Sequence, residues 1–302
     1  MKSSDVKKLR EVFKNSGSIL LTTHRNPDGD GIGSGLALMR SLKSMGKHVD
    51  FVTRDPVPAI YSFLPLSEKV INLAEVKKHY DLIVFLECPD ADRCGRIIDY
   101  KKYGKLTVNI DHHLGNEMYA DVNVVEPTAA AVGMQLYSFM NSAGWKIDRK
   151  TAECLYSAII TDTGSFNYSN TTPEVHEAAA GLIRAGARPA HISSEVYSTT
   201  DSSVKLLSAM MSRMRLESGI CWSVLTRKMF KRTGAADSET DNFINTLRNV
   251  RQARIAVLFK EFGPRTVKVS FRSKTGLDVN YIAKLFDGGG HKYAAGCVVR
   301  KP

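Results

Sequence analysis

The chain has 302 residues, enough for two domains, because single hydrophobic cores stop growing near about 250–300 residues. A composition of 43% hydrophobic and 24% charged residues excludes a disordered, collagenous or disulfide-scaffold protein. The net charge of +11 lies entirely in residues 201–302, with 19 basic and 8 acidic side chains, whereas residues 1–200 are neutral. This split indicates two domains, one of which faces an anion, unless the basic surface is merely solvated.

The first two hundred residues alternate helical and strand-like segments. Apolar periodicity and caps predict helices at 5–14, 33–46, 128–143, 149–160 and 173–185. Short apolar, β-branched runs predict strands at 18–23, 48–53, 81–86 and 106–110. This alternation is typical of an α/β domain, and it predicts a mostly parallel, doubly wound sheet with helices on both faces.

The last third of the chain follows a different pattern. Residues 190–215 are helical in pattern and are expected to connect the two domains. Beyond them the sequence predicts a small α+β domain, with strands at 221–226, 254–260, 266–272 and 296–300 and helices at 240–249 and 278–286. The expected boundaries are therefore 1–190 for the first domain, 191–215 for the connector and 216–302 for the second domain.

The cysteines and the first residues bear on the cellular compartment. The chain has an odd number of cysteines and no CxxC pair: Cys88, Cys94, Cys154, Cys221 and Cys297. This pattern favours a reducing, cytoplasmic setting and argues against zinc-thiolate or disulfide chemistry. The start MKSSDVKKLREVF lacks the apolar block of a signal peptide, and no run approaches the roughly 18 apolar residues of a membrane helix. We expect a cytoplasmic protein without a membrane segment.

Ionisable side chains gather where the predicted strands end, which is where ligands bind in open α/β sheets. They are His24, Asp28, Asp30, Glu87, Asp111, His112, His113 and, near the end of a predicted helix, Asp162. Each residue alone is more often a cap or a turn residue, but together they would repel one another unless cations were bound. Carboxylates with a few imidazoles suit Mn²⁺ or Mg²⁺, and two ions about 3.5–4 Å apart are a common device for attack on phosphorus.

These motifs, together with the tail FRSKTGLDVNYIAKLFDGGGHKYAAG at 271–296, resemble the DHH phosphoesterases and their companion DHHA1 domain. The resemblance covers essentially the whole chain and keeps the order of the motifs. Since no regulatory domain is attached, the chain is most similar to the stand-alone NrnA-type branch. That branch implies hydrolysis of very short RNAs or of 3′-phosphoadenosine 5′-phosphate, and in some members of cyclic dinucleotides or their linear products.

The resemblance also implies roles for individual residues. His24 and Asp28 would hold one divalent ion, with Mn²⁺ preferred and Mg²⁺ as the alternative. Asp30, His112 and Asp162 would hold the second, and the late-strand acid Glu87 would bridge both. Asp111 would orient its neighbouring histidine, and His113 would stabilise the phosphate during the reaction. The substrate would be bound by Arg272, Ser273, Asn280, Gly288, Gly289, Gly290 and His291.

Two positions depart from the family pattern. Glu87 stands where the family usually has aspartate, and three interpretations remain open: Glu87 bridges the ions, Asp90 compensates, or the metal pair is weakened. We favour the first, because the other ligand positions match the family. Asp287 stands where the family's glycine run usually begins. A carboxylate there would alter the turn or reduce affinity for the distal phosphate of the substrate.

Several alternatives stay open at this stage. Arg248, Arg251 and Arg254 either line the substrate site or simply solvate one face of the second domain. The rival functions are a manganese inorganic pyrophosphatase, a weakly active nucleotide-binding sensor and an RNA-binding module. The expected partner is a short RNA or small nucleotide, no protein partner is evident, and a homodimer is possible.

Overall fold

The computed structural model describes the chain except for residues 77–78, 95–99, 241, 275 and 301–302. The chain divides into two compact units, Met1–Ser198 (unit 1) and Thr199–Pro302 (unit 2). The segment 191–215, expected as a connector, contains most of α7 (Pro189–Tyr197) in unit 1 and all of α8 (Asp201–Met211) in unit 2. None of the described helices is both long and apolar enough to span a membrane.

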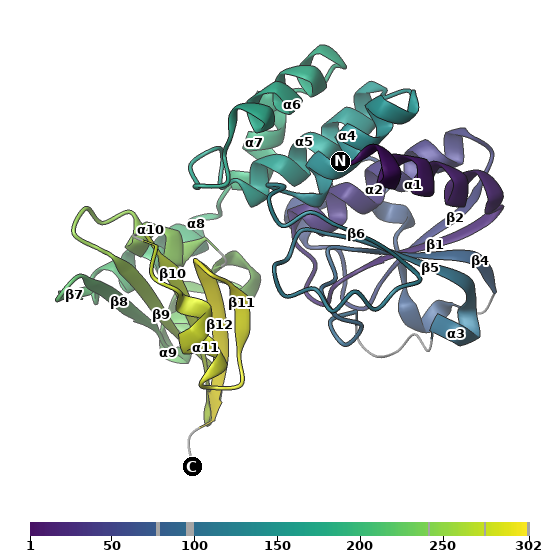
Figure 1. Cartoon of the computed structure of the whole chain (residues 1–302). Coiled ribbons are helices and arrows are strands. Elements are labelled where there is room, and N and C mark those ends of the chain that lie inside the picture. The colour runs from purple at the N-terminus through teal and green to yellow at the C-terminus, as the bar shows by residue number, and fades with distance from the viewer. Residues whose placement is uncertain (77–78, 95–99, 241, 275, 301–302) are drawn as a thin grey trace. The chain divides into compact units, whose positions relative to one another are not determined.

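Unit 1 is built on a six-stranded parallel sheet with the strand order β3-β2-β1-β4-β5-β6 (Figure 1). The strands are β1 (Ser18–Thr23), β2 (His48–Thr53), β3 (Ile71–Asn72), β4 (Tyr80–Leu86), β5 (Gly104–Asp111) and β6 (Val122–Val125). The predicted α/β class with a parallel sheet is confirmed. The edge strands β3 and β6 were not predicted, because two to four residues are too few for an alternating pattern to be visible.

The helices of unit 1 pack mainly on one face of the sheet. They are α1 (Ser3–Asn15), α2 (Gly29–Ser44), α3 (Tyr100–Tyr103), α4 (Val132–Ala143), α5 (Arg149–Asp162), α6 (Pro173–Arg184) and α7, with 3₁₀ turns at Ala59–Tyr61, Ser67–Lys69 and Leu73–Glu75. Ile19 and Leu21 of β1 face the large core with α1, α2, α4 and α5, whereas Leu20 faces a smaller cluster. Among the described helices, the short α3 lies outside this main layer, where it contacts β4 and β5. The predicted helices are therefore found mainly on one face, and the described part of the second face carries only α3.

The strand order places a topological switch point beside β1. The chain passes from β1 to β2 on one side and returns to β4 on the other, so β1 pairs in parallel with both. The connections leaving the carboxyl ends of β1 and β4 therefore run in opposite directions, and ligands of open α/β sheets bind at such an edge. His24 follows β1 and Glu87 follows β4, so the fold brings their loops together at this edge.

Unit 2 contains a second six-stranded sheet with the order β11-β12-β10-β9-β8-β7, in which only β8 and β9 pair in parallel. Its strands are β7 (Arg215–Glu217), β8 (Ile220–Leu225), β9 (Ile255–Gly263), β10 (Thr266–Ser273), β11 (Gly289–His291) and β12 (Ala294–Arg300). Its helices are α8, α9 (Arg227–Thr233), α10 (Phe243–Arg248) and α11 (Val279–Lys284), with a 3₁₀ turn at Asp237–Thr240.

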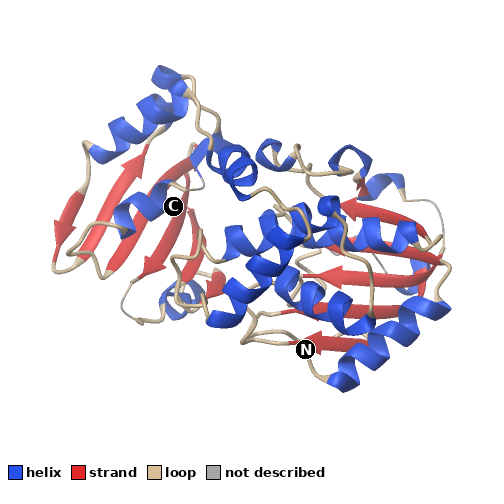
Figure 2. Ribbon diagram, turned by 90° about the horizontal axis from the view of Figure 1, so that it is seen from above, coloured by secondary structure: helices blue, strands red, loops and turns tan. Residues whose placement is uncertain are grey.

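The two faces of this second sheet have separate apolar clusters, one around Leu206 and Leu247 and one around Phe271 and Val279. Figure 2 shows the helices lying across the strands in each unit. The α+β class predicted for the last third is confirmed. The elements α9, β7 and β11 were missed, since each is short and β11 begins in the glycine run.

One expectation about the cysteines was wrong. Cys88 and Cys94 form a disulfide, whereas the odd number of cysteines had argued against any pairing. Counting cannot detect a pair six residues apart, because the contact depends on how the chain turns after β4. Cys154, Cys221 and Cys297 are free and buried, as expected for thiols that contribute to a core.

Candidate metal centre

The site begins at the N-terminus of α2, directly after β1. The Oδ1 atom of Asp28 accepts hydrogen bonds from the backbone N–H groups of Asp30 (3.0 Å) and Gly31 (3.1 Å), so Asp28 is the N-cap of this helix. This capping role is the ordinary one for an aspartate that follows a strand, and it explains the local turn. It does not exclude a second role, because a carboxylate can accept more than two hydrogen bonds or bind a cation as well.

A first group of ligand atoms comes from two loops, the one after β1 and the one after β4. His24 Nε2 lies 3.8 Å from Asp28 Oδ1 and 3.4 Å from Glu87 Oε2. His24 Nδ1 lies 2.8 Å from the carbonyl oxygen of Arg25. Since a carbonyl only accepts, Nδ1 carries the proton, and in the neutral ring Nε2 holds the lone pair that a metal ion needs.

A second group of ligand atoms lies beside the first. His112 Nε2 is 3.9 Å from Asp30 Oδ2 and 3.6 Å from Asp162 Oδ2. His112 Nδ1 lies 3.1 Å from the carbonyl oxygen of Ala129, which again assigns the proton to Nδ1 and points the lone pair of Nε2 toward the carboxylates. His24 and His112, which follow different strands, therefore present the same ring nitrogen to the acidic cluster.

Glu87 is common to both groups. Possible ligand atoms lie within 4.8 Å of one another in the set His24, Asp28 and Glu87 and in the set Asp30, Glu87 and His112. The Glu87 side chain is buried, and its Oε2 atom has no hydrogen-bond partner within the described structure. A buried carboxylate oxygen without a hydrogen bond is costly unless a cation lies next to it. The oxygen and imidazole donors, and this orphaned oxygen, fit a pair of Mn²⁺ or Mg²⁺ ions.

The backbone of Glu87 is unusual as well. Its φ of +58° lies in the left-handed region, which costs free energy for a residue with a Cβ atom. The backbone N–H of Glu87 still donates to Ile110 O at 3.0 Å, so the residue continues the β4–β5 pairing by one step before the chain turns. The turn directs the longer glutamate side chain back over the strand ends.

Asp30 is held in place by the start of another helix. Its Oδ2 accepts from the N–H of Val132 (2.6 Å), and its Oδ1 accepts from the N–H of Gly133 (2.9 Å) and the Ser34 hydroxyl (2.9 Å). These N–H groups belong to the first turn of α4, where the helix dipole favours a negative charge. The hydrogen bonds fix the position of Asp30 before any ion is bound.

Glycines at the start of α2 allow the close approach that this centre requires. A Cβ atom on Gly31 would lie 2.4 Å from Thr23 Oγ1 and 3.1 Å from Glu87 Oε2. A Cβ atom on Gly33 would lie 2.5 Å from the backbone oxygen of Cys154 in α5. A side chain at either position would push α2 away from β1 or α5, so the glycines serve packing as well as the turn.

The electrostatics of the cluster indicate a deficit of positive charge. Burial, with the neighbouring charges of Asp28 and Asp30, raises the pKa of Glu87 well above its ordinary value. Burial likewise raises the pKa of Asp30 to about 6 and that of Asp162 to about 8. Without a cation, Asp162 is therefore mostly protonated at neutral pH and Asp30 partly so. Bound divalent ions would allow all of them to ionise.

The pKa values of His24 and His112 are raised as well, although burial acts on a histidine in the opposite direction. Burial opposes charging of His24, but the carboxylates of Glu87 and Asp28 outweigh it and raise the pKa of His24. The pKa of His112 is raised in the same way, with burial opposed by the charges of Asp162 and Asp30. Burial also opposes ionisation of Asp28, yet the hydrogen bond and charge of His24 lower its pKa below the usual range.

His113 belongs to a separate hydrogen-bonded chain. Its Nδ1–H donates to Asp111 Oδ1 at 2.7 Å, and the amide of Asn116 donates to Asp111 Oδ2 at 2.6 Å. Burial raises the pKa of Asp111, but the His113 hydrogen bond outweighs it and the net pKa falls to about 2. Burial lowers the pKa of His113 despite this carboxylate. Asp111 thus orients His113, the histidine next but one, whereas its immediate neighbour His112 is oriented by Ala129.

Asp90 lies outside this arrangement. Its Oδ1 accepts from the backbone N–H of Arg93 at 2.8 Å, and its Oδ2 lies 3.7 Å from Arg93 Nε. It therefore stabilises its own turn and belongs to neither group of possible ligands among the described residues. Of the three interpretations of Glu87, compensation by Asp90 has the least structural support.

The predicted substrate residues of unit 2 gather around β10 and α11. The backbone N–H of Ser273 donates to Tyr293 O at 2.9 Å, and the N–H of Val279 donates to Lys292 O at 2.9 Å. These two bonds hold the end of β10, the start of α11 and the β11–β12 turn together. Ser273 Oγ and Asn280 Oδ1 are buried without a hydrogen-bond partner in the described structure. Arg272 lies on β10 directly before Ser273.

The glycine run ends α11 and begins β11. Asp287 has a φ of +54°, a conformation that suits glycine and that aspartate tolerates better than most residues. A Cβ atom on Gly288 would lie 2.3 Å from the backbone oxygen of Gly296, and Gly289 and Gly290 pair with β12. The run therefore forms a helix end and a tight hairpin, which explains its glycines structurally. The backbone of His291 ends β11, but its side chain lies outside the described part of the structure.

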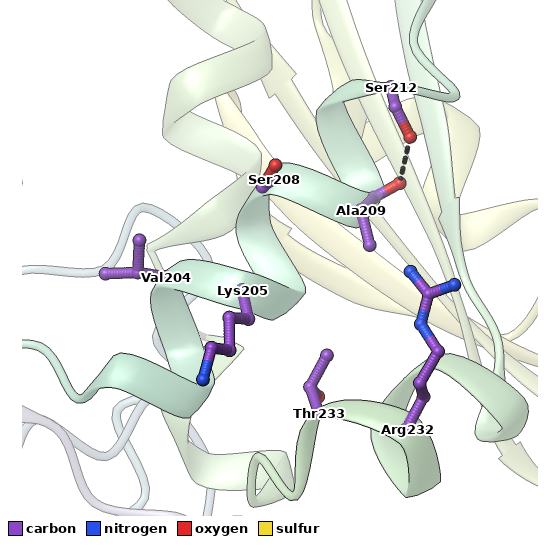
Figure 3. Close-up of a pocket in the computed structure, with 7 residues that line it drawn as sticks. All are labelled: Val204, Lys205, Ser208, Ala209, Ser212, Arg232 and Thr233. Carbon is purple, nitrogen blue, oxygen red and sulfur yellow. Dashed lines mark hydrogen bonds between the residues drawn. The ribbon is translucent and has the colours of Figure 1, made fainter.

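A hollow of about 540 Å³ in unit 2 lies apart from these residues (Figure 3). It lies between α8 and α9 and is lined by Val204, Lys205, Ser208, Ala209, Ser212, Arg232 and Thr233. Lys205 is already paired with Asp201, four residues before it on the helix. None of the predicted substrate residues lines this hollow.

Sequence reasoning missed the groups that support the site. Asn116 was missed, although it lies only three residues after His113. The N–H groups of Val132 and Gly133 leave no trace in the sequence, because every residue except proline carries one. Ser34 is visible only once α2 is known to begin at Gly29, four residues earlier than predicted.

Comparison with known proteins gives a consistent family. The DHH family, N-terminal domain, matches residues 18–159, and the DHHA1 domain matches residues 222–302. A bifunctional oligoribonuclease and PAP phosphatase NrnA from Thermus thermophilus is 32% identical over 291 residues, which cover 96% of this chain and 87% of that protein. The protein of the same name from Bacillus subtilis is 30% identical, covering 93% of this chain and 89% of that protein.

A solved structure supports the same fold. The crystal structure of an exopolyphosphatase-related protein from Bacteroides fragilis matches with a TM-score of 0.93, covering 98% of this chain and 91% of that one. Its sequence is 23% identical, so the match concerns the fold alone. The order of the strands and the placing of the acidic cluster at their ends agree with a phosphoesterase.

Proposed function

This chain belongs to the DHH family of phosphoesterases, and we propose that it hydrolyses short nucleotides, namely RNAs of a few residues and 3′-phosphoadenosine 5′-phosphate. The observation that carries the proposal is the buried Glu87 carboxylate, which is shared by two groups of ligand atoms at the switch point of the sheet. The substrate class is supported by the two relatives whose names include both activities.

In this proposal the metal ligands divide between two positions. His24 and Asp28 would hold one ion, Asp30, His112 and Asp162 would hold the other, and Glu87 would bridge them. Mn²⁺ suits this mixture of carboxylates and imidazoles best, and Mg²⁺ is the alternative. When bound, two such ions supply an activated water near neutral pH and offset charge on the phosphoryl oxygens.

His113 would contribute from the chain itself. Its Nδ1–H is held by Asp111, so Nε2 is the ring nitrogen that would contact a phosphate oxygen. A second proton at Nε2 is stabilised by the Asp111 carboxylate and by an anionic phosphate, and His113 would then donate to the phosphoryl group as its charge grows. Asp111 acts through His113 and is a positioning residue. Asn116 holds Asp111 in place by donating a hydrogen bond to its other carboxylate oxygen.

Unit 2 would bind the nucleotide. Ser273 Oγ and Asn280 Oδ1 are buried polar atoms that lack partners in the described structure, which supports a polar ligand near them. Arg272, the glycine run Gly288 to Gly290 and His291 would complete this subsite, as the family resemblance implies. The cytoplasmic location and a homodimer remain predictions, and neither is needed for the chemistry.

The test is a hydrolysis assay with Mn²⁺ over RNAs of two to five residues, 3′-phosphoadenosine 5′-phosphate, pApA, cyclic di-AMP and pyrophosphate, with the products identified. We expect turnover of the short RNAs and the bisphosphate, and losses of at least about 10³-fold in Asp30→Asn and His112→Ala. Glu177→Gln, on the exposed side of α6, is the control and should retain full activity. Full activity of both ligand variants, in EDTA as well as in Mn²⁺, would refute the proposal.

The same assay separates the rivals. Release of phosphate from pyrophosphate alone would indicate a pyrophosphatase. Cleavage of cyclic di-AMP in preference to short RNA would indicate a cyclic dinucleotide phosphodiesterase. Tight binding of a dinucleotide without turnover in excess Mn²⁺ would indicate a sensor, in which Glu87 had weakened the metal pair.

A further inference from the structure

A buried pair of cysteines directly follows Glu87, the acid that both groups of ligand atoms share. Cys88 is the next residue, and its disulfide with Cys94 closes a ring over a sequence separation of six. We call residues 88–94 the disulfide loop. Cys88 is 0% exposed and Cys94 is 4% exposed, and both belong to the small apolar cluster around Phe85. The disulfide therefore restrains the backbone immediately after the proposed bridging ligand.

The first end of the disulfide loop is hydrogen-bonded to the segment that orients His113. The carbonyl oxygen of Cys88 accepts from the side-chain amide of Asn109 at 3.0 Å and from that of Asn116 at 3.4 Å. The Asn116 amide also donates to Asp111 at 2.6 Å, and Asp111 in turn accepts from His113. A shift of Cys88 would therefore be felt on the His113 side of the centre.

The far end of the disulfide loop is hydrogen-bonded to the segment of another ligand. The backbone N–H of Arg25 donates to the carbonyl oxygen of Arg93 at 2.7 Å. Arg25 is the residue after His24, and Arg93 is the residue before the second cysteine. One short covalent ring is thereby connected to the segment of His24 as well as to Glu87.

The backbone conformation of Glu87 depends on the residues around it. Its φ of +58° lies in the left-handed region, and a residue with a Cβ atom stays there only where the surrounding structure holds it. The hydrogen bond from its N–H to Ile110 O holds the side toward β4, and the ring that begins at Cys88 holds the other side. Opening the ring removes the second restraint, so the backbone can relax and withdraw the carboxylate from the centre.

We propose that Cys88 and Cys94 form a reversible redox switch of the metal centre, in which the disulfide form binds divalent ions more tightly than the dithiol form. This inference rests on the proposed function and concerns the regulation of its metal centre. In the switching step the two thiols give up two protons and two electrons, which reduce one molecule of a small disulfide to two thiols. In a reducing compartment such a bond is usually transient and regulatory, which agrees with the odd number of cysteines.

The coupling between the two events must act in both directions. If the disulfide strengthens metal binding, bound metal strengthens the disulfide by the same factor. Couplings of this kind are typically about 5–150-fold, and we expect about tenfold here. The Kd for Mn²⁺ should be about tenfold lower in the disulfide form. The equilibrium constant for oxidation by glutathione disulfide should be about tenfold larger when the centre is saturated with Mn²⁺.

The test uses the full chain in its two redox states, without substrate. One sample is equilibrated with glutathione disulfide and the other with excess glutathione, and both are freed of glutathione without air before Mn²⁺ binding is measured by calorimetry at pH 7. The disulfide fraction at a series of glutathione ratios, with and without Mn²⁺, is measured by mass spectrometry after alkylation of the thiols in denaturant. The two states of the unmodified chain are compared directly, so the test does not depend on the folding of a variant.

Variants assign the effect to this pair. Cys88→Ala/Cys94→Ala should bind Mn²⁺ with the affinity of the dithiol form and should not respond to glutathione. Cys297→Ala, which removes a buried free thiol of unit 2, is the control and should keep the full response.

Two kinds of result would overturn the inference. Equal or weaker Mn²⁺ binding by the disulfide form, or an oxidation constant that Mn²⁺ does not change, would overturn it and leave the metal centre intact. Absence of Mn²⁺ binding in both redox states would overturn the proposed function and this inference together.

Discussion

Metal uptake by this centre should release protons, because some of its acids hold protons when no cation is present. The perturbation is the addition of Mn²⁺ to the metal-free protein at fixed pH. Asp162 has a pKa of about 8 and Asp30 a pKa of about 6, each raised chiefly by burial. Both must ionise to bind an ion, so metal affinity and pH are linked.

The magnitude follows from these two values. At pH 7 a group with a pKa of 8 is about 90% protonated and one with a pKa of 6 about 10%, which together amount to about one proton released. Glu87, His24 and His112 also have raised pKa values, so they can only add to this number. The affinity for Mn²⁺ should therefore rise at least about sixfold between pH 7 and pH 8.

The assay is isothermal titration of the protein with Mn²⁺ in buffers of different ionisation enthalpy at pH 6, 7 and 8. The slope of the observed enthalpy against the buffer enthalpy gives the number of protons released. Asp162→Asn is the control, because asparagine resembles the protonated acid and should remove close to one proton from the count at pH 7. A Kd independent of pH, with no dependence on buffer, would refute the reasoning that these acids are protonated in the empty centre.

Three further predictions concern stability and one concerns the cysteines. In EDTA the melting temperature should fall from pH 6 to pH 8, because the folded chain keeps protons on Asp162 and Asp30 that the unfolded chain has already released. The lowered pKa of His113 acts in the opposite direction, but it is a single group. A melting temperature that rises over this range would contradict the pKa assignments. Gly31→Ala should cost about 1–3 kcal/mol in urea unfolding and weaken Mn²⁺ binding, whereas Gly115→Ala, with open space around its Cβ position, should do neither. Phe139→Ala should cost about 3–5 kcal/mol with metal stoichiometry unchanged, because its ring packs 5.7 Å from Phe13 and 4.9 Å from Trp145. Thiol titration of the unreduced, denatured chain should find three cysteines, and five after reduction; five from the start would exclude the Cys88–Cys94 bond.

The candidate site could be predicted in its residues and only partly in its arrangement. Motifs at strand ends, together with Asp162 near the end of a helix, had identified the acids and histidines that the described structure brings together, because the carboxyl ends of parallel strands meet at one edge. Glu87, which departs from the family pattern, could be located from the sequence, but whether it bridges two ions could not be decided. Whether it reaches both groups depends on its left-handed backbone, which its sequence neighbours do not reveal.

The cysteine pair and the contact between Arg254 and Lys274 show a different kind of limit. A disulfide between Cys88 and Cys94 depends on the path of the turn after β4, which no count of cysteines can predict. Arg254 and Lys274 are twenty residues apart in the sequence, and their contact exists only because β9 and β10 pair in one register.

By itself, the sequence determined the α/β class, the two-part division of charge and which acidic and histidine side chains are candidates for the site. These depend on local periodicity and on residue type, which are properties of neighbouring residues. The tertiary structure decided which carboxylates share a centre, which nitrogen of each histidine faces it, and which backbone N–H groups hold Asp30. Those are consequences of packing between segments distant in the chain, and there the geometry of the strands and helices, rather than the residue type, decides the outcome.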